Sequence, residues 1–319
     1  MALKQFNVLI KGPHLPQRLL DNVEAQFTTF RLWEAADDEA YLQEIGPQID
    51  ALLTSGNPVM GASADLINRL PNLKIICSNG VGYDSIDIKA ASARGVIVTN
   101  TPGVLNACVA DLGMALLLDV ARRVSESDRY ARAGKWLSHG RFPAGCKIGG
   151  KVCGIVGLGS IGLELARRAR AFDMDIHFYN PRSRPDVPYT RHETLKSLAQ
   201  QADFLVLTLP GGTSTRHLID AEILQALGPK GFLINIARGS VVDEQALIQA
   251  LESSQIAGAA LDVFEHEPAI PQALQKRNNV VITPHIASST EETMRAMADL
   301  VFENLLAFAQ GEAVLTRVV

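Results

Sequence analysis

A glycine-rich segment, "KVCGIVGLGSIGLELARRARAF" at 151–172, spaces Gly157, Gly159 and Gly162 as GxGxxG. An apolar run precedes the first glycine and an amphipathic helical pattern follows the last, so the glycines should join a strand to a helix. The first glycine then permits a tight turn, the second lets backbone approach a pyrophosphate, and the third lets helix and strand pack closely. The segment predicts a dinucleotide site, with phosphates at the helix N-terminus, rather than a purely structural turn. The expected contacts are Gly157, Leu158, Gly159, Ser160, Ile161 and Gly162.

The segment "HFYNPRSRP" at 177–185 indicates which dinucleotide is preferred. In NAD-binding versions of this arrangement, a carboxylate about 20 residues beyond the glycines accepts hydrogen bonds from the adenosine ribose. Here Asn180 holds that place, so no carboxylate repels a 2′-phosphate. Arg182 and Arg184 offer charge and forked donors for such a phosphate, and Ser183 offers a hydroxyl. The sequence predicts NADP(H) in preference to NAD(H); two solvated loop arginines are the alternative interpretation.

Three further segments place titratable side chains at the ends of expected strands. They are "INIARGSVVDE" (234–244), "ALDVFEHEPA" (260–269) and "VITPHIASST" (281–290). In open parallel α/β sheets, ligands bind beyond the carboxyl ends of the strands. The three segments are therefore candidates for a catalytic constellation.

The elements that must position these segments are short apolar strands that alternate with helices. Runs without polar alternation suit strands that are covered on both faces, as in a parallel sheet. Five strands are expected in the first third, at 6–12, 30–35, 50–56, 73–80 and 95–100. Six more are expected at 151–159, 175–181, 203–210, 231–237, 258–263 and 280–285. Six strands separated by helices match a doubly wound dinucleotide-binding fold.

A long helix is expected over 104–131 and a final one over 290–311, whose apolar stripe indicates packing. The stripe consists of Met294, Met297, Val301, Leu305 and Phe308. Because only a helix follows the central strands, that helix should return to the first domain. We therefore expect a discontinuous substrate-binding domain, 1–100 plus 288–319, around an inserted dinucleotide-binding domain, 101–287. The default ligand site would be the cleft between the two.

Composition excludes several other classes. The chain of 319 residues is 47% hydrophobic and 20% charged with a formal net charge of −4, which gives no global electrostatic case for nucleic acid or anionic membrane. The first twenty residues are interrupted by Lys, Gly and Pro, and so predict neither a signal peptide nor a membrane span. The four cysteines form no CxxC pair, so reduced thiols in a cytoplasmic protein are expected.

Several blocks together resemble the D-isomer-specific 2-hydroxyacid dehydrogenase family over nearly the whole chain. Besides the glycine loop and the strand-end segments, they are "SNGVGYDSID" (78–87), "NTPGV" (100–104), "VADLGMALLL" (109–118), "LPGGTSTRHLID" (209–220) and "ARGSVVDE" (237–244). The resemblance implies a flavodoxin-like substrate domain around a Rossmann domain. It also implies a homodimer, usually built on the long central helix.

The resemblance assigns roles to one residue from each strand-end segment: Arg238 binds substrate, Glu267 is the carboxylate partner and His285 is the acid/base. A guanidinium fork can hold the planar carboxylate of a 2-oxoacid and polarise its carbonyl, and His can deliver a proton near neutral pH. A nearby Glu would favour imidazolium and raise the pKa of the histidine. Formate-oxidising relatives carry Gln at the Glu position, so Glu267 favours keto-acid chemistry. No metal site is expected in "EHEP", because adjacent residues point in different directions.

The same resemblance predicts residues that line the two ligands. Val81 and Gly82 match a turn whose N–H groups hold the substrate carboxylate, and "LTSGN" (53–57), with Leu53 and Ser55, matches another loop that faces the substrate. The residues that match positions lining the cofactor are Leu209, Pro210, Thr215, Ile236, Ala237, Asp262 and Ser288. Trp136 lies in a segment that in such reductases can reach the active site of the partner subunit; packing is its alternative role.

The arginine-bearing loop, with "LGPKG" (227–231) and "VPY" (187–189), is similar to hydroxypyruvate and glyoxylate reductases and to plant-type hydroxyphenylpyruvate reductases. The favoured prediction is NADPH-dependent reduction of hydroxypyruvate to D-glycerate and of glyoxylate to glycolate. Hydroxyphenylpyruvate reductase, or another D-2-hydroxyacid dehydrogenase, is the alternative within the family. A nucleotide-sensing, corepressor-like binding protein is the alternative of another class.

Overall fold

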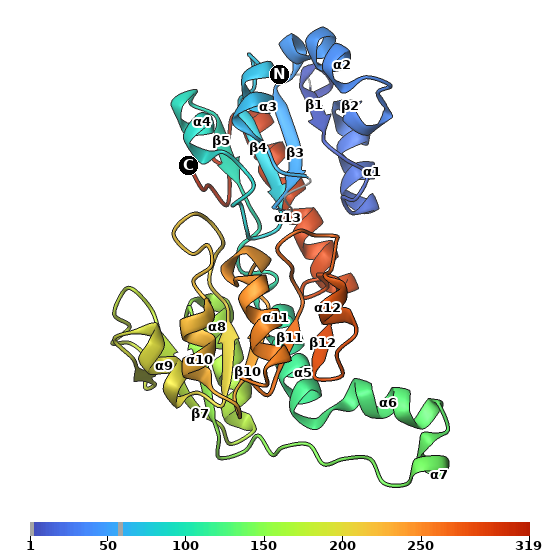
Figure 1. Ribbon diagram of the computed structural model, residues 1–319. Helices are drawn as coiled ribbons and strands as arrows, with labels where there is room; N and C mark the ends of the chain where they lie inside the picture. Colours follow the sequence, from blue (N-terminus) through green and yellow to red (C-terminus); the bar gives the residue numbers. More distant parts are fainter. Residues whose placement is uncertain (1–2, 57–59) are drawn as a thin grey trace. The chain divides into compact units, whose positions relative to one another are not determined.

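The computed structural model describes residues 3–56 and 60–319 (Figure 1). The chain divides into two compact units, Met1–Leu105 with Ser288–Val319 (unit 1) and Asn106–Ala287 (unit 2). Both units are parallel-sheet α/β structures, as the sequence predicts.

Unit 1 contains a five-stranded parallel sheet in the order β2-β1-β3-β4-β5. The strands are β1 (Asn7–Ile10), β2 (Thr28–Arg31), β3 (Ala51–Ser55), β4 (Ile75–Asn79) and β5 (Ile97–Thr99). This is the flavodoxin-like strand order, which the resemblance predicted. The strand expected at 30–35 is misplaced, because β2 ends at Arg31 and Leu32–Glu34 form a 3-10 turn.

Helices cover both faces of the sheet of unit 1. They are α1 (Gln17–Gln26), α2 (Asp38–Ile45), α3 (Ala64–Arg69), α4 (Ile88–Ala93) and α13 (Glu291–Gln310). One buried cluster joins α1 and α13 to the sheet, and a second joins α2, α3 and α4 to it. The final helix thus returns to the first unit, as predicted. Its stripe is buried at Met297, Val301 and Leu305, but the expectation was wrong for Met294, which is exposed in the first turn.

Unit 2 contains a seven-stranded parallel sheet in the order β12-β11-β10-β9-β6-β7-β8. The strands are β6 (Val152–Val156), β7 (Asp175–Tyr179), β8 (Thr190–Arg191), β9 (Phe204–Leu207), β10 (Phe232–Asn235), β11 (Gly258–Leu261) and β12 (Val280–Ile282). The order reverses between β6 and β9, which is the switch point where doubly wound sheets bind nucleotides. The two-residue edge strand β8 was not expected from the sequence.

The helices of unit 2 are α5 (Asn106–Arg122), α6 (Val124–Arg132), α7 (Lys135–His139), α8 (Ser160–Ala171), α9 (Leu195–Gln201), α10 (Ala221–Leu227), α11 (Glu244–Glu252) and α12 (Gln272–Gln275). The single helix expected over 104–131 is wrong, because Arg123 adopts a left-handed conformation with φ 56° and separates α5 from α6. Neither α6 nor α7 has a buried residue. Figure 1 shows these two helices leading away from the sheet of unit 2; we call residues 124–144 the arm.

No disulfide joins the four cysteines, all of which lie among the described residues; Cys77 and Cys153 are buried and the other two are half-buried. Burial raises the pKa of Cys77 and of Cys153 to about 12, so both stay protonated at neutral pH. Among the residues that the structure describes, no helix combines the length and apolar character needed to cross a lipid bilayer.

Candidate active site

The glycine loop lies between β6 and α8, at the switch point of the sheet. Gly157 has φ 96°, and a Cβ there would lie 2.9 Å from the backbone nitrogen of Leu209 on the neighbouring connection. A Cβ at Gly162 would lie 2.7 Å from the carbonyl oxygen of Gly157. The first glycine therefore permits the turn, and the third allows the helix to approach the strand, as the sequence predicted.

The N-terminus of α8 fits an anionic ligand. Gly159 is its N-cap, with no side-chain hydrogen bond to the cap, and, apart from its own chain neighbours and the backbone of the helix, no atom of the described residues lies within 4 Å of where a Cβ of Gly159 would be. The amide of Leu163 donates to the Gly159 carbonyl at 2.9 Å, and the N–H groups before it have no partner within the helix. Open backbone at a helix N-terminus matches the pyrophosphate of a dinucleotide.

The loop after β7 is tied to the glycine loop through the backbone of one residue, Leu158. The Asn180 side chain accepts a hydrogen bond from the amide of Leu158 at 2.6 Å, while Arg184 donates from Nη1 to the carbonyl of Leu158 at 2.5 Å. Arg182 and Ser183 lie exposed. Asn180 and Arg184 thus hold the glycine loop in place, which the spacing of the sequence did not predict.

The other expected cofactor residues of unit 2 follow neighbouring strands. Leu209 lies against Gly157, and Thr215 donates to the Pro210 carbonyl at 2.9 Å. Ile236 and Ala237 are buried after β10. The Ile236 side chain packs against α5, because a Cβ added at Gly113 would lie 2.8 Å from Cδ1 of Ile236. This side chain therefore faces the core rather than a ligand.

An imidazole and a carboxylate meet beyond the ends of β11 and β12. Nδ1 of His285 lies 2.8 Å from Oε2 of Glu267, and the other oxygen of Glu267 accepts the amide of Phe264 at 3.0 Å. Burial acts to raise the pKa of Glu267, but His285, the Phe264 amide and the Arg238 charge together hold it below its usual value. The carboxylate is therefore ionised at neutral pH, and it orients the imidazole.

A buried aspartate shapes the backbone around His285. The histidine has φ 52°, and its amide donates to the Asp262 carbonyl at 2.9 Å. The Asp262 carboxylate accepts Thr283 Oγ1 at 2.7 Å and the amides of Ile286 and Ala287 at 2.8 and 3.0 Å. Burial raises the pKa of Asp262, although these donors act in the opposite direction. These bonds fix the backbone around His285, while the contact of Asp262 with the cofactor stays a prediction.

Arg238 completes the group of three beyond the end of β10. Its backbone is fixed by Asn235, whose side-chain amide donates to the Arg238 carbonyl at 2.9 Å and accepts the amide of Ala237 at 3.0 Å. The half-buried Arg238 donates from Nη1 to the Ala237 carbonyl at 2.7 Å, and its charge reaches Glu267. Strands β10, β11 and β12 are neighbours, so the three predicted catalytic residues come together at one edge of the sheet.

A second network beside Glu267 was missed from the sequence. Glu265 accepts hydrogen bonds from Arg216 at 2.7 Å and pairs with Nε2 of His217 at 2.8 Å. Despite partial burial, which acts to raise it, the pKa of Glu265 is lowered by these two residues. The pairing of His217 with Glu265 could not be predicted from the sequence, because 48 residues separate the two. The network anchors the segment that carries Glu267.

Of the remaining predicted residues, Trp136 is exposed in the arm of unit 2, and the others lie in unit 1. Leu53 is fully buried within β3, so its side chain packs in the core rather than facing a substrate, while Ser55 ends that strand. Asn57 lies outside the described residues. Val81 and Gly82 follow the neighbouring strand β4, and the Gly82 carbonyl lies against Gly56. The two loops are therefore adjacent. Ser288 also belongs to unit 1, before α13.

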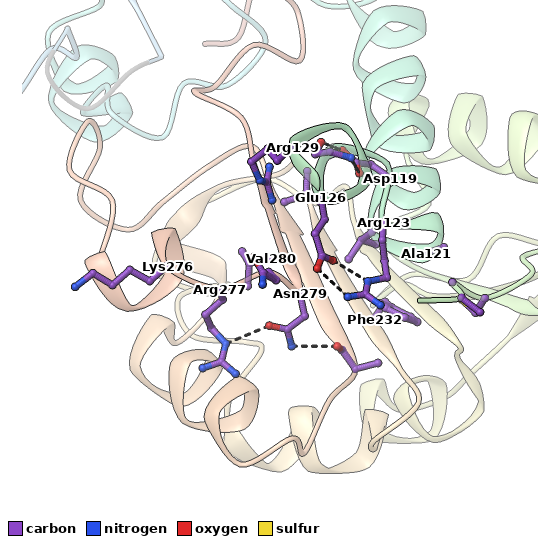
Figure 2. A pocket seen from close by; sticks show the side chains of 18 residues that line it. Asp119, Ala121, Arg123, Glu126, Arg129, Phe232, Lys276, Arg277, Asn279 and Val280 are labelled. Carbon is purple, nitrogen blue, oxygen red and sulfur yellow. Dashed lines mark hydrogen bonds and ion pairs between the residues drawn. The ribbon is translucent and has the colours of Figure 1, made fainter. Parts of the chain in front are cut away.

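A cavity of about 690 Å³ lies elsewhere, at the amino ends of β10 and β12 in unit 2 (Figure 2). Two hydrogen-bonded pairs line this cavity in Figure 2. One joins Arg123 to Glu126, and the other joins Arg277 to Asn279. Its lining contains none of the predicted catalytic or cofactor-binding residues. The cavity is therefore separate from the candidate active site.

Comparison with known proteins places this site in a family. Residues 114–287 match the family described as D-isomer specific 2-hydroxyacid dehydrogenase, NAD binding domain. The chain belongs to this family. It is thus an oxidoreductase, and the matched residues 114–287, which lie within unit 2, correspond to the NAD binding domain of the family.

Relatives with named activities align with 99% of the chain. The chain is 45% identical to glyoxylate/hydroxypyruvate reductase A HPR2 of Arabidopsis thaliana, covering 99% of this chain and 100% of that protein. It is 44% identical to the hydroxyphenylpyruvate reductase of Plectranthus scutellarioides with the same coverage. Among solved structures, an NADPH-dependent glyoxylate/hydroxypyruvate reductase of Sinorhizobium meliloti, in complex with NADP and malonate, matches with a TM-score of 0.92 and 39% identity, covering 99% of this chain and 97% of that one.

Proposed function

We propose that the protein reduces small 2-oxoacids with NADPH, converting hydroxypyruvate to D-glycerate and glyoxylate to glycolate. The observation that carries the proposal is the His285–Glu267 pair at 2.8 Å, with Arg238 on the adjacent strand end. The reductases of Arabidopsis thaliana and Sinorhizobium meliloti support the substrate class. The dinucleotide, when bound, supplies the hydride that goes to the carbonyl carbon.

The residues of the chain supply the rest of the chemistry. Arg238 binds the substrate carboxylate with its guanidinium and polarises the carbonyl. Because Nδ1 of His285 faces Glu267, Nε2 is the nitrogen that delivers a proton to the carbonyl oxygen. The Glu267 carboxylate stabilises the imidazolium before this transfer. The product gains one hydride at carbon and one proton at oxygen, so the reduction balances.

Unit 1 is the proposed substrate-binding domain. Val81 and Gly82 follow β4, beside the loop that follows β3, and both loops leave the carboxyl ends of parallel strands. Backbone N–H groups in such a turn suit a carboxylate. We assign a carboxylate-binding role to the backbone N–H groups of this turn.

The preference for NADPH rests on the loop after β7. Asn180, instead of a carboxylate, follows this strand, and its amide holds the Leu158 peptide. The exposed Arg182 and Ser183 are available to a 2′-phosphate. The NADP complex of the Sinorhizobium meliloti reductase supports this cofactor.

A homodimer is the proposed assembly. In the arm, the side chains of Trp136 and Leu137 are 72% and 97% exposed, and large apolar groups at this exposure are typical of surfaces that bind a partner. Light scattering coupled to size-exclusion chromatography should give twice the chain mass of 34.4 kDa. A monomer at micromolar concentration would contradict this assembly.

The test of function is a substrate panel with both reduced nicotinamides. We expect NADPH oxidation with hydroxypyruvate and glyoxylate at kcat/KM values well above those with NADH. Hydroxyphenylpyruvate is the second candidate, since a relative with 44% identity carries that activity in its name. Turnover of hydroxyphenylpyruvate alone would replace the proposed substrates, and no turnover with any 2-oxoacid would refute the proposal.

A further inference from the structure

The loop 180–189 after β7 holds opposite charges against the glycine loop. Arg184, whose side chain is 25% exposed, is anchored by the bond from Nη1 to the Leu158 carbonyl. Its Nε and Nη2 both donate to the carboxylate of Asp186, at 2.8 and 2.7 Å. The Asp186 side chain is 59% exposed. Arg184 is therefore fixed on the glycine loop, whereas the Asp186 carboxylate lies largely in water.

This Nε–Nη2 edge is the part of an arginine that recognises a phosphate monoester. Two parallel N–H groups match two oxygens of a carboxylate or of a phosphate. Asp186 thus fills, from within the chain, the fork that a 2′-phosphate requires, and it cancels the guanidinium charge at short range. Its spacing of two residues from Arg184 keeps the carboxylate permanently within reach.

We propose that Asp186 sets the cofactor selectivity of this site by competing with the adenosine 2′-phosphate for the Nε–Nη2 edge of Arg184. The inference rests on the proposed function, because it requires NADP(H) to bind beside this loop. When the phosphate binds, the Asp186 carboxylate moves into water while Arg184 stays on the Leu158 carbonyl. A cofactor with a free 2′-hydroxyl needs no such exchange, so Asp186 weakens NADPH binding selectively.

The Asp186 carboxylate is an anion at neutral pH and well into the acid range. The hydrogen bond from Arg184 lowers the pKa of Asp186 to about 2, outweighing the opposing desolvation. A phosphate monoester loses its second proton near pH 6 and then carries about two charges. The exchange therefore sets a dianion against a monoanion, and the phosphate displaces the carboxylate at neutral pH.

The test removes the carboxylate and leaves the arginine. Isothermal titration of the full chain with adenosine 2′,5′-bisphosphate and with 5′-AMP isolates the 2′-phosphate from any nicotinamide chemistry. In Asp186→Asn and in Asp186→Ala, we expect the bisphosphate to bind roughly three- to tenfold more tightly. Binding of 5′-AMP should stay within about twofold of the unaltered protein.

Two controls separate competition from a general change in charge. In an Arg184→Gln background, Asp186→Asn should no longer change bisphosphate affinity, because the shared fork is gone. Glu193 forms the same two-residue pair with Arg191, at 2.8 Å and with a side chain that is 80% exposed. Glu193→Gln therefore removes an equal charge from the same segment, and it should leave both affinities within about twofold.

Unchanged or weaker bisphosphate binding in both Asp186 variants would overturn the inference. So would an equal gain in Glu193→Gln or in the Arg184→Gln background. A selectivity gain that arises only from weaker 5′-AMP binding would make Asp186 a ribose ligand instead. Failure of the proposed function can be told apart from failure of this inference. The first is measured by turnover of 2-oxoacids, and the second by binding of adenosine 2′,5′-bisphosphate and 5′-AMP, which needs no turnover.

Discussion

Two ion pairs at the same edge of the sheet of unit 2 have similar lengths and different surroundings. His285–Glu267 is 2.8 Å long and follows β12 and β11, while Arg184–Asp186 is 2.7 Å long and follows β7. The Glu267 side chain is 13% exposed and also accepts a backbone amide, whereas Asp186 is 59% exposed. A buried pair whose carboxylate has a second hydrogen-bond donor is held as part of the fold. In an exposed pair, another anion can replace the carboxylate.

The difference follows from solvation. A carboxylate that leaves water must regain its hydrogen bonds from the protein, and once it has them it is costly to disturb. Water replaces the partner of an exposed carboxylate at little cost, so such pairs contribute little to stability. Catalysis needs the first kind of pair, because the imidazole must be oriented before substrate arrives. Recognition of a second anion uses the second kind.

The largest effect should come from removing the imidazole. His285→Ala should lower kcat for keto-acid reduction by about 10³-fold, the contribution typical of a positioned general acid. Binding of NADPH, followed by nicotinamide fluorescence, should stay within about twofold. Loss of both activity and cofactor binding would instead indicate misfolding or a cofactor role for His285.

Neutralising its partner should have the next largest effect. Glu267→Gln keeps the size of the side chain and removes the charge that stabilises imidazolium, so reduction should fall by about 10–100-fold. An equal loss of NADPH binding would show that Glu267 has only a structural role.

The loop arginines should matter less than the catalytic pair. Reversing both Arg182 and Arg184 to Asp should weaken NADPH binding by about 2 kcal/mol, or roughly 30-fold, and should weaken NADH binding less, because NADH loses only the Arg184 support of the glycine loop. The effect should shrink at high ionic strength, since these groups are exposed. If NADH is already the better cofactor of the unaltered protein, the assignment of this loop is wrong.

The same contrast explains what could be predicted from sequence. Non-alternating apolar runs predicted both parallel sheets, and residues that follow predicted strands were placed correctly at one edge, as for Arg238 and His285. The two-residue strand β8 is too short to produce a pattern, and the break at Arg123 occurs without Gly or Pro. The pairing of Asp186 with Arg184, and of His217 with Glu265, depends on loop conformation and on tertiary contact, which residue spacing does not encode.

The smallest expected effect concerns acid stability, and it distinguishes the two pairs without any ligand. The folded-state pKa of Glu267 is lowered from its usual 4.5, so its contribution to stability is present above that value and lost as pH falls through the folded-state pKa. Between pH 6 and pH 3.5, thermal unfolding should therefore show a smaller loss of Tm in Glu267→Gln than in the unaltered protein. The difference corresponds to about 1 kcal/mol or less in the free energy of unfolding. The pKa of Asp186 is also lowered, but its carboxylate is largely in water, so Asp186→Asn should follow the unaltered curve. Equal flattening in both variants would show that exposure does not separate the pairs, because the exposed carboxylate would then stabilise the fold as much as the buried one.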